Sequence, residues 1–419
     1  MLRLGLVCLW LTLGALVWAQ SPQEPLQLKQ AVDQALEKNL ELLSRRFDLD
    51  IAKARIITAG MHPNPTLSLG ADHLDWLGTI YDEENAAGPS EYSIRSDWVF
   101  EGGGKRARRL EVAELSEKVT QLELREAARQ LVLDVENAFV EVVLEQGHLH
   151  LAQENRDGFN RILRISQERV RAGDLAKVEL MRTRLAQLHY DNSVILAQSR
   201  LRTAKQRLLL LMGHTGPEMQ FEVEGQLPRP SLKRPLSEME QIAITRRPDY
   251  LAILKDQERG EAAIRLEEAN GKSDYVAGIE YRRQQGLAGR GNSVGLFFAV
   301  PLPIFDTNEG EIERARQEYQ QLLARAKALE ASIRQQLASA LQEYEAAERT
   351  VQQIESSMLS QARQVLDTME YAYRAGHASL VELLDAQRTY NDTVSSYNEA
   401  LAQYARSRFA LEAITGGNP

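Results

Sequence analysis

One short motif occurs twice in this sequence, and its repetition constrains the fold more than any other feature. The first copy reads Arg-Val-Arg-Ala-Gly-Asp-Leu-Ala-Lys-Val-Glu-Leu (169–180), and the second reads Ala-Tyr-Arg-Ala-Gly-His-Ala-Ser-Leu-Val-Glu-Leu (372–383). The two copies align without a gap, and each lies between two long stretches of helical periodicity. Each copy therefore predicts the tip of a helical hairpin, and two equivalent tips predict a chain built from two equivalent halves.

The composition excludes several classes of protein. The 419 residues suffice for two or three domains, and the net charge of −9 argues against a nucleic-acid-binding surface, which needs a basic excess. The single cysteine, Cys8, excludes a disulfide framework and a cysteine metal cluster. The abundance of Ala, Leu, Glu, Gln and Arg is typical of long exposed helices.

The N-terminal residues 1–19 have the pattern of a signal peptide. Arg3 supplies the positive charge, Leu4 to Val17 form an apolar stretch of about 14 residues, and Val17-Trp18-Ala19 resembles a small-residue cleavage site. The stretch is short for a membrane-spanning helix, which needs about 20 apolar residues, although an uncleaved anchor is the alternative. We therefore expect an exported protein whose mature chain begins near Gln20 and contains no cysteine.

Helical and strand patterns divide the remaining chain into two repeats. The first repeat spans 20–212, a linker with four prolines spans 213–235, and the second repeat spans 236–419. In each repeat we expect one helix, two strands, a long helix, the hairpin tip and a return helix. The expected helices cover 26–59, 105–170 and 175–212 in the first repeat, and 236–269, 308–373 and a return to 414 in the second. A helix of about 65 residues would be on the order of 100 Å long.

Four runs of alternating apolar and polar residues predict strands at 66–72, 92–98, 275–282 and 293–300. One face of these runs is apolar, whereas the other carries Ser68, Asp72, Arg95, Asp97, Glu280 and Arg282. Such strands fit a barrel with lipid outside and water inside. An open sheet of four strands would leave backbone groups unpaired in lipid, so two copies are the minimum and three copies would give twelve strands. The alternative is a small soluble β-domain at the end of a coiled coil.

Several motifs resemble those of the TolC-like outer-membrane efflux factors, and the similarity extends from about residue 28 to residue 415. The motifs that lead into the first strand are Asn39-Leu40-Glu41-Leu42 and Pro63-Asn64-Pro65-Thr66-Leu67. The motif similar to the strand-to-helix junction of the cobalt–zinc–cadmium resistance branch is Phe100-Glu101-Gly102-Gly103-Gly104-Lys105-Arg106, with Arg109 and Ala113. Its counterpart in the second half is Pro301-Leu302-Pro303-Ile304-Phe305-Asp306, with Gly310 and Ala315. The most specific match is Tyr373-Arg374-Ala375-Gly376, continued by Val381-Glu382-Leu383-Leu384-Asp385-Ala386-Gln387.

The resemblance implies a mainly α protein with a small β part: a long α-helical barrel continued by a transmembrane β-barrel, with four strands per protomer and twelve in a homotrimer. It further implies an outer-membrane location with the helical barrel in the periplasm. The implied partners are outer-membrane lipid, a periplasmic adaptor protein and an inner-membrane pump of the resistance-nodulation-division type. On this basis we expect the passive exit duct of a tripartite efflux system, and the metal branch suggests divalent metal cations as substrates. The other hypotheses are a periplasmic coiled-coil adaptor and a secreted hydrolase on a helical scaffold.

The resemblance also implies a periplasmic gate near the second tip. Glu382 and Asp385 are three residues apart on one helix face, and acidic residues at these positions narrow the tunnel mouth in the family. Three copies would place about six carboxylates around one axis, where they would attract cations. Glu179, the repeat partner of Glu382, matches an acidic position that the family's closed form bonds to a tip tyrosine, here Tyr373. Ala378 replaces the basic residue of that latch. A solvated helix face is the alternative for Glu382 and Asp385.

The two tips are the expected contact with the adaptor. Their residues are Arg171, Gly173 and Asp174 in the first copy, and Arg374, Gly376 and His377 in the second. Glycine permits the positive φ of a tight reversal, so the turns by themselves are structural. The repeated arginine and the matching flanking residues indicate the docking role.

Patterns for catalysis, cofactors and metals lead to no site. Gly102-Gly103-Gly104-Lys105 lacks the spacing of a phosphate-binding loop. His148 and His150 are two residues apart and hence on different helix faces, without a visible third ligand, which favours ordinary surface histidines over a zinc site. No nucleophile–base arrangement is visible, so we expect no enzyme activity and no cofactor.

Overall fold

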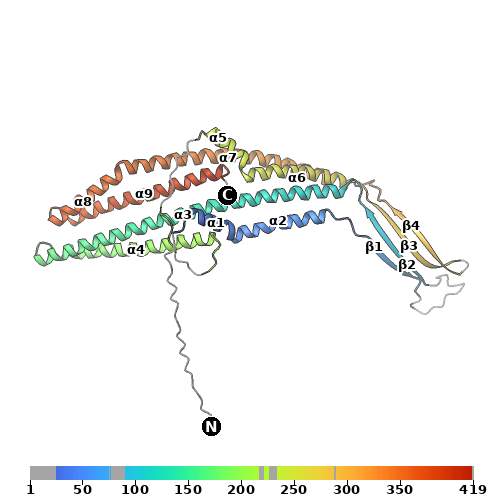
Figure 1. Ribbon diagram of the computed structural model, residues 1–419, viewed down its shortest axis with the longest axis horizontal. Helices are drawn as coiled ribbons and strands as arrows, with labels where there is room; N and C mark the ends of the chain where they lie inside the picture. The colour runs from blue at the N-terminus through green and yellow to red at the C-terminus, as the bar shows by residue number, and fades with distance from the viewer. Residues whose placement is uncertain are drawn as a thin grey trace, which may run out of the picture.

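The computed structural model describes residues 25–74, 76, 90–216, 221–225, 234–286 and 289–417. The predicted signal peptide at 1–19 lies outside the described residues, and the predicted linker at 213–235 lies only partly within them. The described chain is strongly elongated. The strands lie at one end, the two hairpin tips lie at the other, and short helices lie near the middle (Figure 1).

Each repeat begins with two helices rather than the single helix that we expected. These helices are α1 (Leu28–Lys38), α2 (Leu40–Ala59), α5 (Leu236–Arg246) and α6 (Pro248–Asn270). Asn39 is extended, and its side-chain oxygen accepts a hydrogen bond from the Leu42 amide at 3.0 Å, which caps α2. At the matching place Pro248 is the first residue of α6, where a missing amide costs no helical hydrogen bond. The predictions of unbroken helices over 26–59 and 236–269 were therefore wrong.

The long helices form two antiparallel hairpins. The first consists of α3 (Lys105–Ala172) and α4 (Lys177–Leu211). In the second, the outgoing helix is divided into α7 (Glu309–Gln353), a π-helical turn η1 (Ile354–Met358) and α8 (Leu359–Ala375), and α9 (Leu380–Ile414) returns. With 68 residues, α3 is about 100 Å long. The π-helical turn was not predicted, because it absorbs an extra residue without ending the helix and leaves the apolar spacing on both sides intact.

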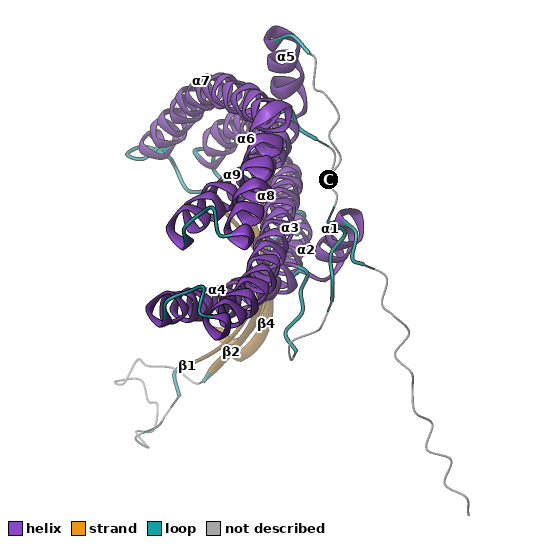
Figure 2. Ribbon diagram, turned by 90° about the vertical axis from the view of Figure 1, so that its left-hand side faces the viewer, coloured by secondary structure: helices purple, strands orange, loops and turns teal. Residues whose placement is uncertain are grey.

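The helices form a curved wall, with α1 and α5 on its convex side (Figure 2). In the half nearer the strands, the packing order is α2, α3, α6 and α7. In the half nearer the tips, the order is α4, α3, α9 and α8. Within the described residues the wall therefore has two free edges, one formed by α2 and α4 and the other by α7 and α8. None of the described helices combines the length and the apolarity that a membrane-spanning helix needs.

The four strands form one antiparallel sheet in the order β1-β2-β3-β4. Their bounds are β1 (Thr66–Asp72), β2 (Glu91–Phe100), β3 (Tyr275–Gly286) and β4 (Gly289–Ala299). The strands β3 and β4 continue until Gly286 pairs with Gly289, so both are longer than the predicted strands at 275–282 and 293–300. The four predicted strands are all present, and β1 and β4 are the two edges.

The sheet has one apolar face and one polar face, as the alternation predicted. On the apolar face, the exposed apolar side chains are those of Leu67, Leu69, Tyr92, Ile94, Trp98, Phe100, Tyr275, Ile279, Tyr281, Val294, Leu296 and Phe298. The polar face also has an exposed aromatic residue, Phe297, whose ring lies under the Arg95 guanidinium. On the polar face, Arg95 pairs with Asp97 at 2.9 Å, and Arg282 pairs with Glu280 at 2.7 Å. Bare apolar side chains opposite a face of ion pairs are the pattern of a barrel wall between lipid and water.

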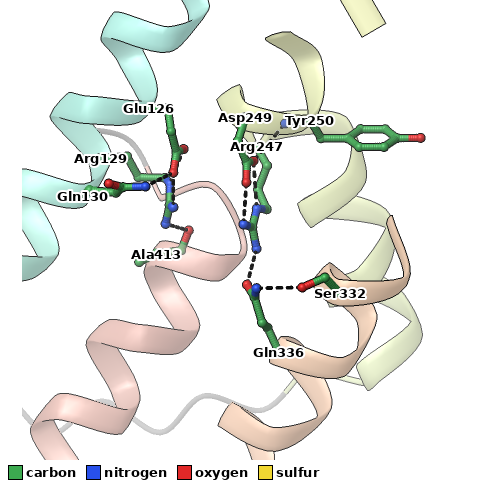
Figure 3. Close-up of polar contacts among 9 residues, drawn as sticks. All are labelled: Glu126, Arg129, Gln130, Arg247, Asp249, Tyr250, Ser332, Gln336 and Ala413. Atoms are coloured by element: carbon green, nitrogen blue, oxygen red, sulfur yellow. Dashed lines mark hydrogen bonds and ion pairs between the residues drawn. The ribbon is translucent and has the colours of Figure 1, made fainter. Parts of the chain in front are cut away.

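Two buried arginines tie helices together near the middle of the chain (Figure 3). The Arg247 guanidinium forms a two-point ion pair with Asp249, with 2.6 Å between Nη2 and Oδ2, and donates to Gln336 Oε1 on α7 at 2.9 Å. Arg129 on α3 donates to the Ala413 carbonyl oxygen at the end of α9 at 2.9 Å. Burial acts to raise the pKa of Asp249, but the hydrogen bonds and charge of Arg247 outweigh burial and hold that pKa below its usual range.

Replacing Arg247 with alanine should destabilise the fold by roughly 3–5 kcal/mol, because the partly buried Asp249 carboxylate would lose its counter-charge. The control Arg334→Ala breaks an exposed pair with Glu330 and should cost less than about 1 kcal/mol. Thermal unfolding in detergent, followed by circular dichroism, measures both. Because the pKa of Asp249 is lower in the folded state than in the unfolded state, its ion pair stabilises the fold at pH values above the ordinary pKa of 3.8. This stabilisation is lost as the pH falls through the pKa of the folded state. The difference between wild type and R247A should therefore shrink below pH 3.8, and equal effects of both variants would contradict the assignment.

Glu136 on α3 is a largely buried carboxyl group. Burial raises its pKa to about 8, and the charge of Glu412 on α9 acts in the same direction, whereas Arg408 opposes both. A carboxyl whose pKa is raised in the folded state resists ionisation there. The folded state therefore loses stability as the pH rises from the ordinary glutamate pKa of 4.5 to about 8.

Glu136→Gln should match the wild type in thermal stability near pH 4, where the Glu136 carboxyl is mostly protonated in both the folded and the unfolded state. Near pH 9 the variant should be the more stable by a few kcal/mol, since it has no charge to bury. Unfolding temperatures measured across this pH range test the expectation. A difference that does not change with pH would contradict it.

Candidate functional site

The two hairpin tips have the same backbone geometry. Gly173 and Gly376 adopt left-handed φ angles of 85° and 80°. The amide of the following residue then bonds back over five residues: Asp174 N to Arg169 O at 2.8 Å, and His377 N to Ala372 O at 2.8 Å. This is the hydrogen-bond pattern with which glycine ends many helices. The repeated Arg-Ala-Gly sequence thus specifies two equivalent reversals of the chain.

Tyr373 lies in the core of the tip and joins the two hairpins. It is only 2% exposed, and its hydroxyl is 2.9 Å from Ser166 Oγ on α3. Arg169 donates to the Tyr373 carbonyl oxygen at 3.1 Å, and its guanidinium lies over the ring. The buried apolar side chains of this cluster are Phe159, Ile162, Leu366, Leu380, Leu383 and Ala386. Because these residues come from α3, α8 and α9, the cluster holds the ends of both hairpins together.

The chain does not bring Glu179 and Tyr373 together. The Glu179 carboxylate, in the first turn of α4, pairs instead with Arg182 at 3.0 Å. The Tyr373 hydroxyl already has a hydrogen-bond partner, Ser166, inside the tip core. The Glu179 carboxylate would lose its hydration if it entered this core. Ala378 packs against the same cluster and supplies no charge. Sequence reasoning missed Ser166 and Arg169, the two residues of α3 that bond to Tyr373. Nothing in the local sequence indicates which face of α3 meets α8.

Glu382 has a structural role that the sequence analysis overlooked. Ser379 caps α9, and the Glu382 carboxylate accepts from the Ser379 amide at 2.7 Å and from its hydroxyl at 2.8 Å. The hydrogen bond from that amide, followed by the one from the hydroxyl, lowers the pKa of Glu382 below its usual range. The pattern Ser-x-x-Glu at 379–382 is a capping box, which was visible in the sequence.

The remaining predicted gate and tip residues lie on the surface. Asp385 is exposed one turn after Glu382, so the two carboxylates share the first turns of α9. The exposed tip residues are Arg171, Gly173, Asp174, Arg374, Gly376 and His377. Among them, Arg374 pairs with Glu370 one turn earlier at 3.1 Å. The two tips therefore present a mixed set of charges at the same end of the molecule (Figure 1).

An apolar stripe along α4 is a second feature that sequence reasoning missed. Its exposed residues are Val178, Met181, Leu185, Leu188 and Ile195. Their three–four spacing is that of a coiled-coil seam, and it could be recognised in the sequence. The spacing alone does not indicate whether the chain's own helices cover the stripe. In the described chain they do not, because α4 is the edge of the wall.

The glycine-rich junction between β2 and α3 is an ion-paired joint between the repeats. Lys105 pairs with Asp274 at 2.7 Å, and the Gly102 amide donates to the same carboxylate at 2.9 Å. The Gly102 Cα lies so near β3 that an added Cβ would be 1.9 Å from the Ser273 carbonyl oxygen. Lys105 and the glycines before it superficially suggest phosphate binding. Their role is instead to let the loop after β2 approach the loop before β3 closely.

The described residues include no group of three or more His, Cys, Asp and Glu side chains that could hold a metal ion. His150 is exposed, but His148 is not the surface residue that we expected. Its side chain is mostly buried, with Nδ1 3.6 Å from Glu145 Oε2. Its position on the face of α3 that meets the neighbouring helices explains the burial.

The sequence matches the family described as "Outer membrane efflux protein" over residues 31–214 and 240–417. The chain belongs to this family. It is similar to the cobalt-zinc-cadmium resistance protein CzcC of Cupriavidus metallidurans, with 25% identity over 401 residues that cover 96% of this chain and 92% of CzcC. It is also similar to nodulation protein T of Rhizobium leguminosarum bv. trifolii, with 21% identity over 412 residues, 95% of this chain and 87% of that protein.

Solved outer-membrane channels share the fold. CusC aligns with a TM-score of 0.76 and 18% identity over 93% of this chain and 92% of its own. The Campylobacter jejuni CmeC outer membrane channel aligns with a TM-score of 0.77 and 13% identity over 99% and 94%. Relatives of this kind are trimeric channels in which a helical barrel continues a β-barrel. The protein is thus an outer-membrane efflux channel and not an enzyme, and the hypotheses of a periplasmic adaptor and of a hydrolase are set aside.

The capping role of Glu382 can be separated from a role of its charge by mutation. Glu382→Gln with Asp385→Asn removes two charges per chain, but glutamine can still complete the capping box. This variant should keep its thermal stability and lose cation preference in single-channel recordings. Glu382→Ala should also lower the stability of the fold, because it removes one half of the capping box.

The matched control is Glu238→Gln on α5, which neutralises an exposed carboxylate on the convex side of the wall. It should leave ion selectivity unchanged. If the double variant conducts with unaltered selectivity, Glu382 and Asp385 form an ordinary solvated helix face.

Proposed function

We propose that this channel is the exit duct of a tripartite efflux system. It would act as a homotrimer whose β-barrel crosses the outer membrane and whose helical barrel extends through the periplasm. At the periplasmic end it would meet an adaptor protein and, through it, an inner-membrane pump. The observation that carries this proposal is that the sheet and the helical wall have their free edges on the same two sides of the chain.

The edges of the sheet require further copies of the chain. In lipid, every backbone amide and carbonyl of β1 and β4 needs a partner, which only a closed barrel supplies. When β4 of one copy pairs with β1 of the next, the direction of the strands stays antiparallel. Three copies would close a barrel of twelve strands, within the range of known spanning barrels. The contact is head-to-tail, so the ring closes by rotation.

The edges of the helical wall support the same arrangement. The wall ends in α2 and α4 on the side of β1, and in α7 and α8 on the side of β4. The apolar stripe of α4 defined above would then be covered by α8 of the neighbouring copy. Exposed apolar residues on η1 and α8 include Met358 and Val365. Burial of such side chains between long helices is the usual source of stability in a coiled-coil seam.

In the proposed ring, the gate and the docking site would both lie at the tips. Rotation about one axis would bring three copies of Glu382 and Asp385 around the mouth of the tunnel, and the paired tips would face the adaptor. The tip core around Tyr373 supports this role, because it fixes both hairpins of one protomer as a unit. Opening would then move whole hairpins rather than single side chains.

Heavy-metal cations are the substrates that we propose. The support is the similarity to CzcC, which extends over nearly the full length of both chains. The described residues offer no metal-binding cluster, so the channel would conduct cations without holding them, and the pump would provide the selectivity. Negative charge at the tunnel mouth suits the passage of cations.

The duct is tested by locating and recording the protein. We expect it in the outer-membrane fraction, soluble only with detergent, with the mass of three chains by light scattering and with discrete conductance steps in planar bilayers. Recovery as a soluble monomer without conductance would contradict the proposal.

The substrate class is tested in the source bacterium. Deletion of the gene should increase sensitivity to cobalt, zinc and cadmium salts, and a plasmid copy should restore resistance. Sensitivity to dyes and detergents serves as the comparison. If the deletion strain becomes sensitive only to organic compounds, the exit-duct function stands but metal cations are not the substrates.

A further inference from the structure

The order of the strands determines which loops meet at the periplasmic rim of the barrel. β2 pairs with β3 in antiparallel fashion, so the loop after β2 lies against the loop before β3. In a closed ring, β4 would pair with β1 of the next copy. The loop after β4 would therefore lie against the loop before β1 of that copy. The first contact lies within one chain, and the second lies between copies.

The contact within one chain is short, tight and charged. Only residues 101–104 separate β2 from α3. A Cβ on Gly103 would lie 3.0 Å from the Ala269 carbonyl oxygen and 2.8 Å from the Lys272 side chain. The Lys105–Asp274 ion pair completes the joint. There is no room for a side chain at Gly102 or Gly103.

The loop after β4 has the opposite character. It comprises residues 300–308, and its exposed apolar residues are Leu302, Ile304 and Phe305. Phe305 has an exposed fraction of 101%, so nothing in the described chain covers it. A single exposed aromatic residue would be ordinary, but three exposed apolar residues within four positions form a patch of the kind that marks a binding surface.

Both ends of this loop are fixed to the rest of the chain. Ser273 Oγ donates to the Pro301 carbonyl oxygen at 2.5 Å. Asn308, with a left-handed φ of 67°, donates from its side chain to the Glu267 carbonyl oxygen at 2.9 Å. Gly271 leaves room for the Thr307 carbonyl oxygen, which a Cβ there would meet at 2.3 Å. The apolar middle of the loop is thus presented in a defined position.

The segment before β1 is a suitable receiving surface. Ile57 and Met61 are exposed, and the segment His62-Pro63-Asn64-Pro65 contains no carboxylate to match Asp274. A cleft of about 390 Å³ lies beside it, with apolar lining from Pro63, Trp98, Val99 and Phe100, and with His62, Glu101, Gly104, Lys105 and Arg106 completing its wall. An aromatic ring and these side chains can bury each other's apolar surface.

We propose that Phe305 packs against the Met61–Pro63 segment of the neighbouring copy and forms an apolar seam at the rim of the barrel. The inference rests on the proposed ring of copies. Each protomer would then have two different rim joints, a charged joint inside the chain and an apolar joint between chains. Because their chemistries differ, the loop after β4 fits the neighbour's first repeat and not a second repeat, which fixes the head-to-tail register of the ring.

Paired cysteines test the contact in the full-length protein. The only native cysteine, Cys8, lies in the predicted signal peptide, so the mature background is expected to be free of thiols. Phe305→Cys together with Met61→Cys in one chain should form covalent dimers and trimers under mild oxidation. Each single variant should remain monomeric in denaturing gels, since identical positions are apart in a head-to-tail ring. Absence of cross-linked species from the double variant would overturn the seam.

A probe at the same position distinguishes the neighbour from the bilayer. A bimane label attached to the thiol of the single variant Phe305→Cys should be shielded from nitroxide-bearing lipids and from iodide in the proposed seam. Strong quenching by the lipids would show that position 305 faces the membrane, and strong quenching by iodide would show that it faces water; either result overturns the proposal. Light scattering and conductance of the same samples report whether the ring itself has formed, so a failed seam remains distinguishable from a failed duct.

Charge and size variants provide the last comparison. Phe305→Leu keeps the apolar contact and should retain the trimer after mild heating in dodecyl sulfate. Phe305→Asp should lose it under the same conditions, because the carboxylate cannot be buried against the proline segment. The matched control Leu236→Asp replaces another exposed apolar residue, on α5 at the convex side of the wall, and should leave the heat resistance of the trimer unchanged. Equal heat resistance of the leucine and aspartate variants would overturn the proposal.

Discussion

The hydrogen-bonding demand of the peptide backbone is the constraint on which the rest of this structure depends. A sheet of four strands with apolar side chains on one face suits a bilayer, but its first and last strands each carry a row of unsatisfied amides and carbonyls. The chain cannot satisfy them alone. The helical wall shares this incompleteness, because its free edges lie on the same two sides as β1 and β4. Closure by further copies would pair the edges of the sheet, and it would also cover the edges of the wall and the bare apolar stripe of α4.

The two repeats share one backbone arrangement, but they differ in the residues at their tips and rim loops. Both tips use glycine in the same left-handed conformation, and both long helices begin after a left-handed residue, Gly104 or Asn308. The second tip alone buries a tyrosine against the first hairpin and carries the capping-box glutamate followed by Asp385. The rim loops differ in the same way, with glycines and a lysine in the first repeat and Phe305 in the second. The two repeats therefore have the same backbone geometry at these places but expose different side chains.

Most elements could be predicted because their determinants are local. Alternation identified four strands, glycine identified the tips, and heptad spacing identified hairpins about 100 Å long. The errors at Asn39 and Glu382 concern contacts that are local but were overlooked, because each side chain bonds to a residue only three positions away. Asn39 reads as an ordinary helical residue until its side chain is seen to cap α2, although Pro248 at the matching site was a usable indication. Glu382 was assigned to the gate for its charge, while the Ser-x-x-Glu pattern that ties it to Ser379 went unnoticed.

The sequence by itself determined the periodicity, the two-fold repetition, the places where the chain reverses, and the need for more than one copy. These properties follow from side-chain spacing and from the backbone's fixed geometry. Only the tertiary structure decided that Tyr373 bonds to Ser166 rather than to Glu179, that Lys105 neutralises Asp274, and that Phe305 is left bare. Each of these outcomes depends on which helix faces and loops meet across more than 150 residues of chain or, for Phe305, fail to meet. These contacts depend on how helices and loops pack in three dimensions, and the local sequence does not specify that packing.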